Sequence, residues 1–176
     1  MSDDLYISQP LTARGGFTAG IEGPACDRDG NIYAVNYARQ GTIGKVTPTG
    51  QCEVFVQLPE GSIGNGIRFN RAGEMLIADY TNHNILKVAM ETRAISVYAH
   101  EPTAHQPNDL CITDDDLIFC SDPNWQRGDG QFVPLQSTLE TLLRFRYTEA
   151  QQTISANNQQ YVKLVVNRCK DDDFND

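Results

Sequence analysis

Apolar and polar residues alternate with a period of two through most of the chain up to residue 130, which is the pattern of half-buried β-strands. Gly residues and Asn-Gly pairs interrupt any stripe with the helical period. Two matching groups of three segments carry the alternation: 31–35, 43–47 and 52–56, then 75–78, 84–88 and 94–98. Turn-forming clusters such as Pro48-Thr49-Gly50 separate them. The pattern predicts an all-β fold as far as residue 130.

These segments belong to a repeat of 43 residues. Glu22, Asn65 and Asn108 hold the same position in three consecutive copies, and each copy runs into a strand-like segment, at 31–37, 74–80 and 117–122. Repeats of roughly 40 to 50 residues made of short strands are typical of β-propeller blades. We therefore expect about three blades, whose innermost strands begin near a common axis at these three residues.

The repeat stops beyond residue 131, because all fourteen glycines lie at or before Gly130 and the position that follows Asn108 by one repeat is Gln151. Strand junctions need residues that tolerate positive φ, and this part of the chain has few of them. Thr138–Phe145 is expected to form a short amphipathic helix. We divide the chain into a partial propeller at 1–131 and an aberrant tail at 132–176, irregular or partly helical.

A shifted reading frame is one hypothesis for this break. The third copy should supply a strand similar to 43–48, whereas the chain has Phe132-Val133-Pro134-Leu135-Gln136-Ser137. Codons for these six residues, read one base later, can spell Leu-Cys-Arg-Tyr-Asn-Pro, which has the apolar, basic and proline positions of the expected strand. The nucleotide sequence beyond codon 131 tests the hypothesis.

The charge balance argues against a nucleic-acid surface, since the net charge is -9 and the pI is about 4.7. No apolar run is long enough to cross a bilayer, and the segment that starts at Met1 lacks a basic region followed by an apolar one. Five cysteines, an odd number without a C-x-x-C pair, favour thiols over a disulfide framework. Cys26 and Cys120 replace apolar residues of the second copy and are expected to be buried. We expect a cytoplasmic protein.

A divalent cation is the ligand suggested by the three converging residues. Carboxylate and amide oxygens suit a hard cation, which takes six to eight oxygen ligands if it is calcium. Glu22 is the informative member, because its equivalents Asn65 and Asn108 are amides, so the one carboxylate breaks the repeat where a cation requires charge. Asn65, followed by Gly66, is equally well explained as part of a hairpin turn. An Asx-turn is the structural alternative for Asn108, for which a functional role is preferred.

Other polar residues are better explained by structural roles. Asp79 and Asp122 are repeat equivalents at strand ends, where they would serve as hydrogen-bond acceptors, and 114–116 falls on a turn. The three histidines share no repeat position or metal-ligand spacing, and Trp125 is expected to pack.

At the repeat residues the chain resembles the family of senescence marker protein, gluconolactonase and luciferin-regenerating enzyme, in its bacterial gluconolactonase branch. The matching segments are Ile21-Glu22-Gly23-Pro24 to Tyr33, Gly64-Asn65-Gly66-Ile67 to Tyr80, and Pro107-Asn108-Asp109-Leu110 to Pro123. The resemblance implies a six-bladed propeller whose central divalent metal, often calcium, polarises a sugar-lactone carbonyl for attack by water. It implies that Glu22 binds the metal and that Asn108, with Asn65, lines the substrate pocket.

The resemblance also implies what this chain lacks. The family takes further metal ligands, including the general base, from its fourth and fifth blades, so no catalytic residue is assigned here and reduced or no activity is expected. Three blades leave two open flanks, which favours self-association. The segment 79–88 also resembles the NHL repeat of propellers that bind partners without chemistry, so a binding module is the alternative function. A carboxylate at the axis, Glu22, distinguishes the two.

Overall fold

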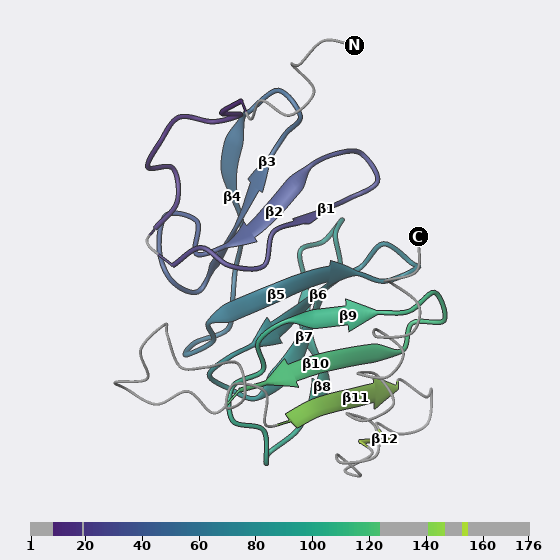
Figure 1. The fold of residues 1–176 in the computed structure, drawn as a ribbon. Coiled ribbons are helices and arrows are strands. Elements are labelled where there is room, and N and C mark those ends of the chain that lie inside the picture. The colour runs from purple at the N-terminus through teal and green to yellow at the C-terminus, as the bar shows by residue number, and fades with distance from the viewer. Residues whose placement is uncertain (1–8, 19, 124–140, 147–152, 155–176) are drawn as a thin grey trace, which may run out of the picture.

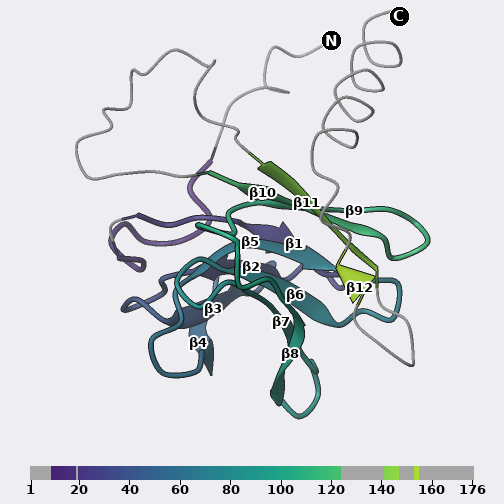
Figure 2. The same ribbon diagram turned by 90° about the horizontal axis from the view of Figure 1, so that it is seen from below.

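The computed structural model describes residues 9–18, 20–123, 141–146 and 153–154, which form three four-stranded antiparallel sheets and no helix. Each sheet is a meander in which strands that follow one another in the chain pair with each other. No helix among these residues is long and apolar enough to cross a membrane. The three sheets lie one after another, as Figure 1 and the perpendicular view of Figure 2 show.

The first two sheets are the first two copies of the repeat. The first contains β1 (Ala25–Cys26), β2 (Ile32–Val35), β3 (Thr42–Val46) and β4 (Cys52–Gln57). The second contains β5 (Gly64–Phe69), β6 (Met75–Asp79), β7 (Asn84–Val88) and β8 (Ile95–His100). The strands that the alternation predicts are therefore present, with ends that differ by one or two residues.

The third sheet completes the third copy with strands from further along the chain. It contains β9 (Leu110–Ile112), β10 (Ile118–Asp122), β11 (Thr141–Arg146) and β12 (Thr153–Ile154). The helix expected over Thr138–Phe145 is wrong for the described residues 141–145, which lie in β11. The physical reason is the free edge of β10: β9 pairs with one edge, and the backbone groups of the other edge are paired by β11.

The innermost strands of the three sheets lie side by side. β5 contacts β1 and β2 on one side and β9 on the other, and Figure 1 shows β5 running between β2 and β9. The N-terminal ends of β5 and β9 are therefore brought together near one axis. This is the arrangement of successive blades around a propeller centre.

Two apolar cores hold the sheets together, one in each seam between neighbours. Tyr33, Val35 and Ile43 of the first sheet pack on Met75 and Ile77 of the second. On its other side the second sheet uses the intervening residues of β6 to build a core with the third, which contains Leu76, Ala78, Leu110, Ile118 and Cys120. All five residues of β6 are buried because both faces of its sheet are covered, so Met75 to Ala78 are apolar without alternation, and only the last residue, Asp79, is polar.

A bulge in the outermost strand sends one aromatic side chain into each core. Ile43 and Gly44 pair with Val56 and Val54, which leaves Phe55 as the extra residue of β4. Tyr98, which follows Phe55 by one repeat, is the extra residue of β8 in the same position. Phe55 and Tyr98 are only 5% and 9% exposed, although β4 and β8 are otherwise largely exposed. The repeat therefore preserves the irregularities as well as the strands.

Candidate functional site

The three residues expected at the axis lie on neighbouring segments. Glu22 precedes β1 and is exposed, Asn65 lies in β5, and Asn108 precedes β9. The carbonyl oxygen of Glu22 accepts a hydrogen bond of 3.3 Å from the backbone N–H of Val35, which fixes this segment to β2. The structure brings the three segments together in the order that the repeat predicts, and the roles of the side chains in binding stay predictions.

Close backbone approach joins the first segment to the second. A Cβ atom on Gly23 would lie 2.1 Å from the carbonyl oxygen of Asn65 and 2.7 Å from the Cα atom of Gly66. Gly23 also has a φ of +55°, a conformation that L side chains rarely adopt. Only glycine fits there, so the residue after Glu22 holds the first blade against Asn65.

The second segment is joined to the third in a similar way. The N–H of Gly66 donates a hydrogen bond of 2.7 Å to the carbonyl oxygen of Asn108. A Cβ atom on Gly66 would lie 2.6 Å from Oδ1 of Asp109 and 2.9 Å from the same carbonyl oxygen. Glu22, Asn65 and Asn108 are thus connected through their backbones, segment by segment.

Asn65 and Gly66 do not form a hairpin turn, so that interpretation of the pair is wrong. Gly64 pairs with Asp79 and Ile67 pairs with Ile77, which leaves Asn65 and Gly66 as the two residues of β5 opposite one residue of β6. This is a β-bulge, which re-aims side chains and often lies next to functional sites. Pairing with β6 and the hydrogen bond to Asn108 outweigh the preference of the Asn-Gly dipeptide for a turn.

The third blade repeats this irregularity. The N–H of Asn108 donates to the carbonyl oxygen of Ser121, and the N–H of Ser121 donates to the carbonyl oxygen of Asp109, at 2.9 and 3.0 Å. Two residues before β9 are therefore paired with one residue of β10. The bulges at Asn65 and Asn108 are 43 residues apart, so the two asparagines lie at equivalent irregularities of their blades.

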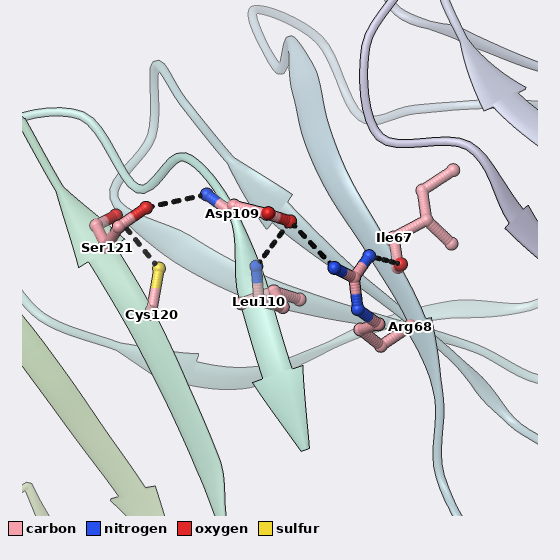
Figure 3. Close-up of polar contacts among 6 residues, drawn as sticks. All are labelled: Ile67, Arg68, Asp109, Leu110, Cys120 and Ser121. Atoms are coloured by element: carbon pink, nitrogen blue, oxygen red, sulfur yellow. Dashed lines mark hydrogen bonds and ion pairs between the residues drawn. The ribbon is translucent and has the colours of Figure 1, made fainter. Parts of the chain in front are cut away.

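Sequence reasoning missed Arg68, which connects the second and third blades (Figure 3). Its Nη2 lies 3.3 Å from Oδ1 of Asp109, and its Nη1 donates to the carbonyl oxygen of Ile67 at 2.7 Å. The same Asp109 oxygen accepts from the N–H of Leu110 at 2.8 Å. Both side chains are partly exposed, so the ion pair adds little stability and mainly orients the start of β9. The sequence signal was available, because the equivalents of Arg68 are the uncharged Ala25 and Cys111.

The acidic residues predicted as structural hydrogen-bond acceptors are confirmed in that role. Asp79 is fully buried and accepts from the hydroxyl of Ser62 at 2.8 Å and from the amide of Asn84 at 3.1 Å. Asp122 is 1% exposed and accepts from the N–H groups of His105 and Gln106. Each carboxylate holds the loop that leads into the innermost strand of its own sheet, and neither is exposed to a ligand.

Asn36 occupies the position of Asp79 and Asp122 in the first sheet. Its Nδ2 donates to the carbonyl oxygen of Gly20 at 3.0 Å, so it also holds the loop before its innermost strand. It is 6% exposed, and its Oδ1 has no hydrogen-bond partner among the described residues. In the blade that carries Glu22, the loop is therefore held by the neutral amide of Asn36, whereas the other two sheets use a carboxylate.

The remaining candidates divide as follows. Asp114 and Asp115 are exposed, on a turn, as expected. Cys120 is buried, and burial raises the pKa of its thiol, whereas Cys26 is exposed, so the expectation that it is buried is wrong. Cys26 lies at the open end of the first seam. Phe69, its equivalent one repeat further along the chain, packs against the core. Trp125 lies outside the described residues.

A cavity among the described residues lies elsewhere, at the opposite end of the blades from Glu22. It measures about 520 Å³ and is lined by residues of β1 to β5 and of the turns after β1, β5 and β7. Within the described residues no group of three or more His, Cys, Asp or Glu side chains is arranged to hold a metal ion. Any cation near Glu22 would therefore depend on amide and carbonyl oxygens for its other ligands.

Several solved propellers have a similar fold. A virginiamycin B lyase from Staphylococcus aureus, determined with quinupristin, is 16% identical, with a TM-score of 0.57, and the match covers 78% of this chain and 41% of the lyase. A gluconolactonase from Xanthomonas campestris is 16% identical, with a TM-score of 0.58, over 77% of this chain and 46% of that enzyme. A calcium-binding regucalcin from Agrobacterium tumefaciens is 17% identical, with a TM-score of 0.51, over 62% and 39%.

Neither protein-family models nor curated proteins match the sequence. The similarity therefore shows the fold, which is that of six-bladed lactonase and lyase propellers. The expectation of a β-propeller of this type, with about three blades in the chain, is confirmed. The chain spans less than half the length of these three solved proteins.

Proposed function

We propose that this chain supplies one part of a metal-dependent site for the hydrolysis of sugar lactones. Glu22 would bind the divalent cation, with calcium the first choice, and Asn65 and Asn108 would contact the substrate beside it. The carrying observation is the chain of backbone contacts that brings these three segments together in consecutive blades. The gluconolactonase and the calcium-binding regucalcin that share this fold support the same assignment.

The donor chemistry fits a hard cation but does not complete its coordination. Glu22 offers an exposed carboxylate, and the amide side chains of Asn65 and Asn108 offer neutral oxygens. Calcium takes six to eight oxygen ligands, so three residues leave most positions to water or to other parts of a ring. We therefore expect weak binding by this chain alone, with a Kd of about 1 mM, at the weak end of the range of extracellular calcium-binding modules.

The chemistry of the site divides between the metal and the protein. A bound cation supplies a Lewis acid that polarises the lactone carbonyl. Glu22 anchors it, and the amides of Asn65 and Asn108 donate hydrogen bonds that orient the sugar hydroxyls. The described residues near the axis include no carboxylate assigned as a general base for the attacking water, so little or no turnover is expected from the chain by itself.

Calcium titration by calorimetry tests the proposal. Wild-type protein should release or absorb heat with a saturable curve, and Glu22→Ala should abolish it. Glu22→Gln keeps an oxygen but removes the charge and should weaken binding at least tenfold. Glu60→Ala removes another exposed carboxylate and serves as the matched control, which should titrate as the wild type does. Equal responses from wild type and Glu22→Ala would refute the metal site.

A binding module of the NHL type is the second candidate. It is favoured by the position of the cavity of about 520 Å³, which lies away from Glu22, at the far end of the first seam. Such a module needs no carboxylate at the axis, so it predicts that calcium has no effect. The cytoplasm is the proposed location in either case, which the free thiols of Cys26, Cys52, Cys111 and Cys120 support.

A further inference from the structure

The cavity at the far end of the first seam has the dimensions of a small-molecule site. Its volume of about 520 Å³ lies within the range usual for ligand pockets, roughly 300–1,000 Å³. One wall is the turn 27–31, which joins β1 to β2, and the other includes Phe69 and Met90. Tyr33 and Phe55 form an aromatic base between the two walls, with ring centroids 5.0 Å apart. Apolar surface and charged groups therefore meet in one cavity.

Lys45 lines this cavity, and its equivalent in the second blade shows what it lacks. Lys45 pairs with Tyr33 across β2 and β3, as Lys87 pairs with Leu76 across β6 and β7. The Nζ of Lys87 lies 3.1 Å from Oε1 of Glu74. Within the described part of the chain, Lys45 has no such ion pair and no side-chain hydrogen bond.

In the turn between β1 and β2 the acidic residue and the amide residue are exchanged relative to the second blade. Asn31 stands where the second blade has Glu74, and Asp27 stands where it has Asn70. The N–H of Asn31 donates to Oδ1 of Asp27, and the N–H of Glu74 donates to Oδ1 of Asn70, both at 2.8 Å, so the turn is the same. The exchange of acid and amide therefore changes the charge beside the lysine without changing the fold of the turn.

The Asp27 carboxylate accepts hydrogen bonds from uncharged donors. It accepts from the N–H of Asp29 at 3.0 Å, from the side chain of Asn31 at 2.9 Å and from the hydroxyl of Tyr33 at 3.1 Å. Burial by itself raises the pKa of Asp27, but these hydrogen bonds outweigh it and hold the pKa below its ordinary value. The carboxylate is thus charged and satisfied without contact to Lys45.

The two arginines that line the cavity donate hydrogen bonds to backbone carbonyl oxygens. Arg28 donates to the carbonyl oxygen of Arg71 at 2.9 Å. Arg93 donates to the carbonyl oxygen of Phe55 at 2.9 Å and lies 4.8 Å from the centre of that ring. Glu53, the cross-strand partner of Lys45 in β4, forms its ion pair with Arg93, at 3.4 Å, which leaves Lys45 as the cation to meet a ligand. Asp29 and Glu91, which also line the cavity, disfavour a ligand with more than one negative charge.

We propose that this cavity binds a small monocarboxylate with an apolar body. The ligand carboxylate takes against Lys45 the place that the Glu74 carboxylate takes against Lys87, and the apolar body lies against Phe69 and Met90. The observation that carries the proposal is this pair of equivalent lysines, one with its acid and one facing a cavity. The site is independent of the metal site at Glu22.

The test uses benzoate as the probe, followed by NMR chemical shifts of the full chain. Benzoate should bind with saturable shifts at residues of the cavity, and neutral benzamide of the same shape should bind at least tenfold more weakly. Phthalate, which carries a second carboxylate, should also bind more weakly. Equal binding of benzoate and benzamide would overturn the proposal, as would shifts confined to residues outside the cavity.

Two variants separate the lysine from general effects. Lys45→Met should lose benzoate binding at least tenfold, whereas Lys87→Met, at the equivalent position of the second blade, should retain it. The double exchange Asp27→Asn with Asn31→Glu copies the arrangement of the second blade without a change in net charge. It should place a carboxylate on Lys45 and abolish binding in a folded protein, and wild-type affinity in this double variant would contradict the proposal.

Discussion

Arg28 of the first sheet donates a hydrogen bond of 2.9 Å to the carbonyl oxygen of Arg71 in the second sheet, the residue one full repeat further along the chain. Arg71 donates in turn to the carbonyl oxygen of Asp114 in the third sheet, again one repeat further. The same contact is therefore made at both seams, and it ends at the third copy because an aspartate stands there in place of arginine.

These arginine contacts should contribute to stability as independent units. Arg28→Met and Arg71→Met keep much of the apolar stem and remove the guanidinium, and each should lower the free energy of unfolding by about 1 kcal/mol. The two seams are separate, so the double variant should show the sum. Arg14→Met, at an exposed residue without a hydrogen bond among the described residues, is the control. Urea unfolding measures all four proteins.

Gly23 should be intolerant of any side chain. Gly23→Ala adds a Cβ atom at 2.1 Å from the carbonyl oxygen of Asn65. The backbone fixes the position of this Cβ atom, and the oxygen belongs to the backbone, so neither can rotate away. We expect a loss of about 3 kcal/mol, from the sum of overpacking and the positive φ. Gly73→Ala is the matched control, because Gly73 has a φ of +83° but nothing within 4 Å, so it carries only the cost of φ. Thermal unfolding that is equal in both variants would contradict the close approach.

Asp79 should be among the most sensitive residues of the described chain. Asp79→Ala leaves the buried Ser62 hydroxyl and the amide of Asn84 without their acceptor and should cost about 3 kcal/mol or more. Asp122→Ala should show a similar loss, since two N–H groups lose their acceptor. Chemical unfolding gives both values, and a loss below about 0.5 kcal/mol would show that water replaces the carboxylate.

The hydrogen bonds to Asp27 predict the direction of one pH effect. Because the folded pKa lies below the ordinary value of 3.8, the stabilisation is complete above that value. It is lost as the pH falls below about 3.8 and passes through the folded pKa. Asp27→Asn cannot titrate, so its stability should fall less between pH 5 and pH 2 in roughly the range where carboxylates protonate. Parallel pH profiles for the two proteins would contradict the assignment.

Self-association through open flanks stays a prediction. Within the described residues, three sheets of a six-bladed architecture leave one side of the first sheet and one side of the third without a neighbouring blade. We expect the sedimentation coefficient to rise with protein concentration, because exposed sheet surface favours contact with a second copy. A coefficient that is constant from micromolar to millimolar protein and matches a 19.6 kDa monomer would contradict it.

The repeat made most of the fold predictable. The period of 43 residues located the sheets and the axis, since residues one repeat apart must take equivalent places. It also marked Asp79 and Asp122 as strand-end acceptors. What could not be read from local sequence was the pairing of Asn65 and Gly66, because a dipeptide that favours a turn is held in a strand by the Asn108 segment.

The same limit explains the other failures. An amphipathic pattern around residue 142 fits a helix in isolation, but the free edge of β10 pairs with this segment as β11. Cys26 was judged by the burial of its repeat equivalent, although it lies beside the open cavity of the first seam, where neighbours are fewer. Arg68 was missed because its partner, Asp109, lies on another blade. Each error concerns a contact with residues distant in the chain, within one sheet for β11 and between blades for Arg68, which a local pattern does not reveal.

The arginine contacts have a consequence for how such chains evolve. Donor and acceptor at each seam lie one repeat apart, so the duplication or deletion of a whole repeat leaves every remaining seam with both of its partners. Genes that code for this unit can therefore grow or shrink by recombination without losing the bonds that join neighbours. A further unit placed after the third would lack this donor unless Asp114 were replaced by arginine.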